Sequence, residues 1–220
     1  MRLVIFCCSP RPESVSNTAA IVNAFKDGYG ESADVCYLYR RSEWGNYQKI
    51  FEDNNSFIFA MPLFVECIPG LLMEFLESLP KKKNGAAKTK ISFIVQGGFE
   101  EACQLRTCEK YLEKLPSYLG CEYAGTLIKG GMFVLAISSE KNKKKALKPF
   151  YDMGATYANE MAFSKEAVTA FAAPERYSKA FCLLIKILRL LPIDRVAWNL
   201  VARKFGVEGR LDARPYSFYY

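Results

Sequence analysis

Short apolar runs alternate with segments of helical periodicity through most of this chain, and this alternation restricts the fold more than any other feature. Five apolar runs are typical of strands buried on both faces of a parallel sheet; they cover residues 2–8, 33–39, 56–62, 90–96 and 123–131. Helical patterns follow them at residues 18–30, 40–55, 68–80, 101–120 and 138–162, the first with Gly28 or Gly30 as its expected end. The alternation predicts an α/β fold, a parallel sheet with right-handed crossovers and helices on both faces.

The loop after the first apolar run contains more hydrogen-bond donors than a helix start needs. Its sequence, SPRPESVSNT, contributes hydroxyl, amide and guanidinium groups from Ser9, Arg11, Ser14, Ser16, Asn17 and Thr18. Ser16 or Asn17 alone would suffice as an N-cap. The additional donors, next to the orphan N–H groups and positive dipole end of a helix, indicate a phosphate site. Neither glycine signature of nucleotide-binding loops is present, so side chains would hold the anion.

The loops after the third and fourth runs add an apolar wall and a glycine-rich wall. The residues are Pro62, Leu63, Phe64 and Val65 in MPLFVECIPG, and Gly97, Gly98 and Phe99 in QGGFEE. Exposed apolar side chains are costly unless an apolar group covers them, and glycine lets a ligand approach the backbone. Each loop alone could equally be an internally packed loop or a simple turn. Because loops at the carboxyl ends of parallel strands meet, all three together predict a phosphorylated ligand with a flat ring, such as FMN.

Three stretches, SPRPESVSNTAAIVNAF, MPLFVECIPGLLMEFLE and VQGGFEEA, resemble the flavodoxin-like NAD(P)H-dependent FMN reductase and quinone reductase family over roughly residues 1–160. The resemblance implies a doubly wound five-stranded parallel sheet of order 2-1-3-4-5, bound FMN and NAD(P)H as the reductant. It also implies that Ser9, Arg11, Ser16, Asn17 and Thr18 hold the phosphate, and that the seven residues of the other two loops line the ring. Phe64 departs from the Tyr of many relatives, which removes a hydroxyl near the flavin.

The absence of histidine excludes Ser-His-Asp and Cys-His pairs and histidine-ligated zinc. The eight cysteines contain no CxxC pair, and no compact four-cysteine motif of the iron–sulfur relatives is present, so we expect no metal. Cys7, Cys8, Cys36 and Cys182 lie in apolar runs and are expected to be buried. Cys67 could have a redox role, but a small buried residue near a helix start is the favoured interpretation.

Hydride transfer between a nicotinamide and a flavin needs no general base, because the cofactor carries the chemistry. We therefore expect no catalytic side chain, and backbone N–H groups around Leu63–Val65 and Gly97–Gly98 that stabilise charge on the reduced flavin. Lys129 and the lysine-rich segment 140–148 could attract an NADP phosphate, although a charge run usually forms a solvated face.

These observations favour an FMN-dependent NAD(P)H oxidoreductase that reduces a quinone, flavin, nitro compound or similar small acceptor. The alternatives are a non-enzymatic electron carrier of flavodoxin type and a flavin-binding interaction protein. The net charge of +7 counts against the electron carrier, since flavodoxins usually have an acidic surface for their redox partners.

The alternation of apolar runs and helical segments changes near residue 164, so we expect a flavodoxin-like domain at 1–164 and a helical extension at 165–220. Residues 173–214 hold nine Lys or Arg and four Asp or Glu, and Phe181, Leu184, Leu188 and Leu191 share one helical face. Pro192 and Gly206 should divide the extension into two short helices. A nearly continuous apolar population favours packing on the core or on a second subunit, which makes a homodimer the expected state. The other interpretation is a basic amphipathic helix lying on an acidic membrane.

The sequence also gives expectations for the cellular location of the protein and for nucleic acid as a partner. Nowhere are there 18 consecutive apolar residues, and the N-terminal apolar run is too short for a signal peptide, so we expect a cytoplasmic protein. The charge outside the extension is nearly balanced, which argues against nucleic acid as a partner.

Overall fold

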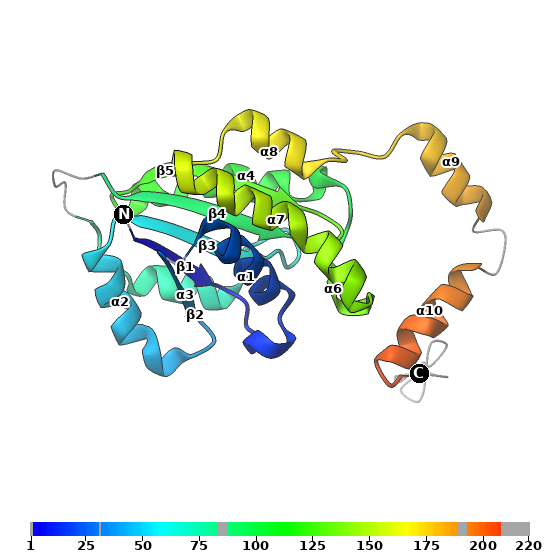
Figure 1. Cartoon of the computed structure of the whole chain (residues 1–220), viewed down its shortest axis with the longest axis horizontal. Helices are drawn as coiled ribbons and strands as arrows, with labels where there is room; N and C mark the ends of the chain where they lie inside the picture. The colour runs from blue at the N-terminus through cyan, green and yellow to red at the C-terminus, as the bar shows by residue number, and fades with distance from the viewer. Residues whose placement is uncertain (1, 31, 83–87, 189–192, 208–220) are drawn as a thin grey trace, which may run out of the picture. The chain divides into compact units, whose positions relative to one another are not determined.

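A five-stranded parallel sheet forms the centre of the chain (Figure 1). The structure is a computed structural model that describes residues 2–30, 32–82, 88–188 and 193–207. The strands are β1 (Leu3–Cys7), β2 (Ala33–Tyr37), β3 (Ser56–Pro62), β4 (Lys90–Gln96) and β5 (Glu122–Lys129). All neighbouring strands pair in parallel, in the order β2-β1-β3-β4-β5. The predicted fold class and strand order are therefore confirmed.

Helices cover both faces of the sheet, as right-handed crossovers require. One face packs against α1 (Asn17–Tyr29), α7 (Glu140–Glu160) and α8 (Lys165–Ala172). The opposite face packs against α2 (Trp44–Asp53), α3 (Gly70–Ser78), α4 (Arg106–Leu112) and α5 (Leu115–Tyr118). Shorter elements are α6 (Val134–Ile137) and the 3₁₀ turns η1 (Glu13–Val15), η2 (Arg41–Glu43) and η3 (Ala102–Gln104).

The strands are apolar throughout because each contributes to two cores. Along β1, Leu3 and Ile5 face the α1 side, whereas Val4 and Phe6 face the α3 side. On the α3 side the ring centroids of Phe6 and Phe59 are 4.9 Å apart. Each such fully buried side chain contributes about 1.5–3 kcal/mol to folding.

Helices α1 and α7 touch backbone to backbone, which only glycine permits. A Cβ at Gly28 would lie 1.9 Å from the carbonyl oxygen of Tyr151, and a Cβ at Gly154 would lie 2.0 Å from that of Phe25. Of the two glycines expected to end α1, Gly30 is the C-cap, with φ of 109°. Gly28 instead lies within α1 and sets its distance from α7.

The helix predicted over residues 101–120 is three separate elements, η3, α4 and α5. Pro116 causes the break between α4 and α5, because its ring would clash with the carbonyl of Leu112 and it has no N–H to donate. Pro116 lies in the first turn of α5, where proline is tolerated.

The first compact unit extends to Arg176, twelve residues beyond the boundary predicted at 164. Val168, Phe171 and Ala172 of α8 are buried, and Lys129 Nζ donates to the carbonyls of Phe171 and Ala173, at 2.7 and 3.0 Å. Burial lowers the pKa of Lys129. This lysine therefore anchors the end of α8 to β5.

The second unit begins at Tyr177 and contains α9 (Lys179–Leu188) and α10 (Ile193–Lys204). Gly206, at φ of 68°, follows the end of α10, and the predicted break at Pro192 lies outside the described residues, as does Leu191.

Cys7, Cys8 and Cys36 are buried as expected, whereas Cys182 of α9 is exposed. Among the described residues no helix is long and apolar enough to cross a membrane.

We expect Gly154→Ala to lower the free energy of unfolding by about 3 kcal/mol, because the methyl group would force α1 and α7 apart. Urea unfolding followed by circular dichroism measures this change. Gly45→Ala is the matched control: a Cβ there meets nothing within 4 Å, so stability should stay unchanged or rise by up to about 1 kcal/mol. Equal stability of Gly154→Ala and the wild type would contradict the backbone contact.

Candidate functional site

A cavity of about 230 Å³ lies where the loops at the carboxyl ends of the strands meet. The loop after β1 contributes Ser9, Arg11, Ser16, Asn17 and Thr18; the loop after β3 contributes Leu63 and Phe64 beside Pro62; the remaining lining residues are Gln96, Gly98 and Phe133. Nine of the thirteen residues predicted from the sequence therefore surround one cavity. In open α/β sheets this crevice, beside the first strand, is the usual ligand position.

Three buried hydroxyls in this cavity share one hydrogen-bonding arrangement. Ser9 Oγ accepts from the N–H of Arg11 at 3.2 Å, and Ser16 Oγ accepts from the N–H of Ala19 at 3.2 Å. Thr18 Oγ1 accepts from the side-chain amide of Gln96 at 3.3 Å. In the described part of the chain each of these oxygens acts only as an acceptor. Since a hydroxyl carries one proton to donate, all three retain a donor for a further acceptor.

The N-terminus of α1 adds backbone donors at the same place. Ser16 caps the helix: its side chain satisfies the N–H of Ala19 and its carbonyl that of Ala20. The N–H groups of Asn17 and Thr18, in the first turn, have no intrahelical acceptor. The side-chain amide of Asn17, predicted as a donor, instead donates to the carbonyl of Met132 at 3.1 Å. Asn17 thus ties the loop after β5 to the start of α1.

The charges around these donors suit an anion. Arg11 lines the cavity, and the nearby carboxylate of Glu13 is paired with Arg40 at 3.1 Å. Burial raises the pKa of the Cys7 thiol to about 11 and that of Cys8 well above its ordinary value. Both thiols are therefore neutral at pH 7 and do not repel a negative group at the end of β1.

A strained turn carries the apolar wall. Phe64 and Cys67 pair through two backbone hydrogen bonds of 3.2 and 3.0 Å, and the intervening Val65 and Glu66 have φ of 47° and 61°. Positive φ at both central residues makes this a type I′ turn, whose usual residues are Asn and Gly. A β-branched residue there is a strained exception, and such exceptions gather at functional sites. Cys67, expected to be buried, is exposed at the end of this turn.

Gly98 lines the cavity although the protein itself does not require glycine there. Its φ lies outside the left-handed region, and a Cβ would meet no protein atom within 4 Å. The missing side chain leaves space that belongs to the cavity. Gly97, in contrast, does not line the cavity; its N–H donates to the carbonyl of Lys129 at 3.0 Å.

Four predicted residues are not among those that line the cavity: Ser14, Val65, Gly97 and Phe99. Ser14 lies exposed in η1, and Val65 at the tip of the strained turn is 98% exposed. Phe99 is also largely exposed, and its carbonyl accepts from the N–H of Gly131. Their positions follow from loop conformation, which the sequence pattern did not reveal.

Three of the backbone N–H groups predicted to stabilise a reduced flavin ring already donate hydrogen bonds within the protein. The N–H groups of Leu63, Phe64 and Gly97 donate to the carbonyls of Gln96, Cys67 and Lys129. Within the described residues, the N–H groups of Val65 and Gly98 have no backbone acceptor of this kind. Of these two residues only Gly98 lines the cavity.

Two lining residues were missed. Gln96 ends an otherwise apolar strand, and a polar residue at that carboxyl end was a usable signal. Besides its amide contact with Thr18, its backbone carbonyl accepts from Leu63 at 2.8 Å, so it connects the loops after β1 and β3. Phe133 follows Gly130-Gly131 after β5; hydrogen bonds of the adjacent Met132 with Asn17 and Gly97 hold this loop beside the cavity.

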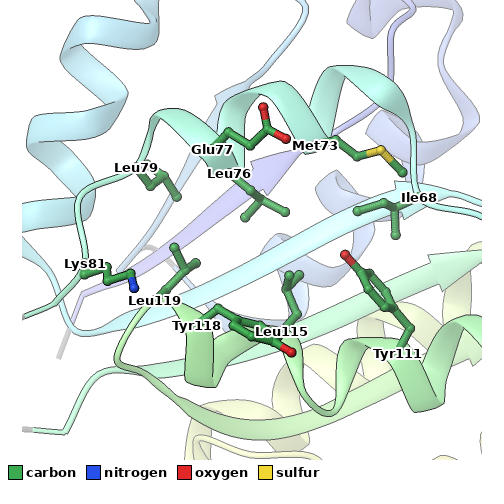
Figure 2. A pocket seen from close by; sticks show the side chains of 10 residues that line it. All are labelled: Ile68, Met73, Leu76, Glu77, Leu79, Lys81, Tyr111, Leu115, Tyr118 and Leu119. Atoms are coloured by element: carbon green, nitrogen blue, oxygen red, sulfur yellow. The ribbon is translucent and has the colours of Figure 1, made fainter.

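A second cavity, of about 380 Å³, differs in character (Figure 2). Met73, Leu76 and Leu79 extend into it from α3 and the residue after it, opposite Tyr111, Leu115 and Tyr118 of α4 and α5. Glu77 and Lys81 are its charged lining residues. Most of its lining residues are apolar, so it offers mainly an apolar surface.

Solved structures share the fold of this chain. A general stress protein 14 from Treponema denticola, in complex with FMN, has a TM-score of 0.56 at 13% identity, over 73% of this chain and 99% of that one. An FMN-dependent NADH-azoreductase from Bacillus anthracis, also with FMN, has a TM-score of 0.55 at 15% identity, over 74% and 100%. An NAD(P)H:quinone oxidoreductase from Methanothermobacter marburgensis has a TM-score of 0.55 at 14% identity, over 71% and 96%. No protein-family profile and no curated protein sequence matches the chain. The similarity establishes a flavodoxin-like fold.

Replacing the strained turn residues, as Val65→Asn/Glu66→Gly, should raise the free energy of unfolding by about 1–2 kcal/mol, because Asn-Gly adopts a type I′ turn without the steric cost. Urea unfolding of the purified variant measures the gain. Val15→Asn serves as control, since Val15 is exposed but has no positive φ. A gain no larger than that of the control would show that residues 65 and 66 store no strain.

Proposed function

We propose that this protein is an FMN-dependent NAD(P)H oxidoreductase that passes electrons to a small acceptor such as a quinone, flavin, azo or nitro compound. The observation that carries the proposal is the set of three buried hydroxyls whose oxygens already accept hydrogen bonds and whose protons are free to donate at the start of α1. A phosphate monoester is the acceptor that such a cluster of donors suits. Structures with the same fold contain FMN.

The residues present fit the cofactor. Ser9, Ser16 and Thr18 would donate to the phosphate, with the N–H groups of Asn17 and Thr18 and the charge of Arg11. Leu63 and Phe64 would cover the ring, and the missing side chain of Gly98 leaves room for it. Phe64 is half exposed, which a flat apolar group would relieve.

The cavity volume is consistent with a site that remains open to a second reactant. At about 230 Å³ it is smaller than pockets that enclose a drug-sized ligand, which measure about 300–1,000 Å³. A flavin bound here by its phosphate would keep part of the ring accessible to a nicotinamide and then to the acceptor.

FMN, when bound, supplies the hydride chemistry, and this chain supplies binding, orientation and electrostatics. The side chains around the cavity include no general base of histidine type, since the chain has no histidine. With a ring bound against them, Leu63 and Phe64 would exclude water from one side of the site. The N–H of Gly98, which lines the cavity, would be the backbone donor available to stabilise negative charge on the ring.

The decisive experiment is a flavin titration followed by anaerobic reduction. We expect purified protein mixed with FMN to retain a flavin spectrum after gel filtration, and NADH or NADPH to bleach it without oxygen. Adding a quinone should then restore the oxidised spectrum. A protein that binds no FMN would refute the proposal, and one that binds FMN but is reduced by neither nucleotide would favour an electron carrier.

Ser9→Ala should weaken FMN binding roughly tenfold, because it removes one charge-assisted hydrogen bond worth about 1.5 kcal/mol. Its affinity for riboflavin, which lacks the phosphate, should not change. Fluorescence quenching of each flavin measures both constants. Ser14→Ala removes a hydroxyl from the same loop that does not line the cavity, and it should alter neither affinity. Equal loss for FMN and riboflavin would mean that Ser9 does not contact the phosphate.

A further inference from the structure

Helix α9 exposes a large part of its apolar surface to solvent. Six large side chains are between 38% and 59% exposed: Phe181, Leu183, Leu184, Ile185, Ile187 and Leu188. The helix is ordered at its start, since Ser178 Oγ accepts from the N–H of Phe181 at 3.2 Å and the rings of Tyr177 and Phe181 are 4.5 Å apart. Exposed apolar surface on a regular helix marks a surface that binds a partner.

The charges of α9 are confined to one side. At 100° per residue, Lys179 and Lys186 lie about 20° apart around the helix axis, whereas the six apolar side chains occupy an arc of about 200° that contains neither lysine. No acidic residue lies between Lys179 and Leu188. A broad apolar face beside a purely basic one is the pattern of helices that lie in the interface of a lipid bilayer.

The unit as a whole has the same charge. Between residues 177 and 220 there are eight Lys or Arg and three acidic residues, Asp194, Glu208 and Asp212. Residues 1–176 hold 22 Lys or Arg and 20 Asp or Glu, so they offer no strong negative charge to complement it. Two copies of the unit would repel each other, whereas the headgroups of anionic lipids would attract it.

The neighbouring helix contributes an interfacial aromatic residue. Trp198 of α10 is 57% exposed, and tryptophan is enriched at the boundary between lipid and water. The described helices are too short or too polar to span a bilayer.

We propose that α9 and α10 bind the surface of membranes that contain anionic lipid, with the apolar face of α9 in the interface and its lysines at the headgroups. The inference does not rest on the flavin site, because it uses only residues of the second unit. It assigns the exposed face of α9 to a lipid surface and not to a second copy of the chain.

Sedimentation with vesicles tests the proposal on the full chain. We expect the protein to pellet with vesicles of phosphatidylcholine and phosphatidylglycerol, less with pure phosphatidylcholine, and less at high salt. Lys179→Gln/Lys186→Gln should bind anionic vesicles roughly 25-fold more weakly, as each basic residue near such a surface contributes about a fivefold factor. Leu184→Gln/Leu188→Gln should weaken binding roughly 100-fold, since each buried leucine contributes about a tenfold factor.

The matched control is Lys144→Gln/Lys145→Gln, which removes two exposed charges from α7 and should leave binding unchanged. Circular dichroism melts should confirm that every variant is folded. Equal pelleting of all variants, or no pelleting of the wild type, would overturn the proposal. So would a dimer in sedimentation velocity that Leu184→Gln/Leu188→Gln dissociates, because the face would then join two copies.

Tryptophan fluorescence gives an independent measurement. The chain has two tryptophans, and Trp44 belongs to the first unit, where its Nε1 donates to the carbonyl of Leu38. In a Trp44→Phe background the emission of Trp198 should shift to shorter wavelength on adding anionic vesicles. Unchanged emission at a vesicle concentration that pellets the protein would show that Trp198 does not enter the interface. That result would contradict the proposal that α10 lies on the membrane with α9.

Discussion

The pairing of β1 with both β2 and β3 is the constraint on which the rest of this structure depends. β1 lies between the two strands in parallel register, and the N–H of Cys8 continues the pairing by donating to the carbonyl of Ala60 at 2.7 Å. The chain leaves β1 toward α1 on one face and leaves β3 toward α3 on the other. Because the two loops diverge, a crevice opens between them at the carboxyl ends of β1 and β3.

The same hydrogen bonds that fold the loops also prepare the crevice for a ligand. Each of its three buried hydroxyls stabilises the protein through its oxygen: Ser9 holds the turn, Ser16 caps α1, and Thr18 fixes Gln96. Their protons remain available. These hydrogen bonds offset part of the cost of burying the three hydroxyls, and they fix the loop residues around the crevice.

The two compact units differ in how far their apolar side chains are buried. The first unit buries its large apolar side chains on both faces of the sheet, down to the backbone contact at Gly28 and Gly154. In the second unit the apolar side chains of α9 are exposed. Apolar side chains thus form a core in one unit and an available surface in the other.

The α/β class, the five strands and the gathering of donors before α1 could be predicted from the sequence, because strand and helix periodicity are local, whereas two candidates remained for each cap of α1. Only the tertiary structure decided that Gln96 and Phe133 reach the cavity, that Phe99 and Val65 do not line it, and that Lys129 anchors α8. These outcomes depend on loop conformation and on contacts between residues far apart in the chain, such as Asn17 with Met132. Local preferences do not contain that information, since it arises when distant segments compete for the same hydrogen-bond partners and the same space.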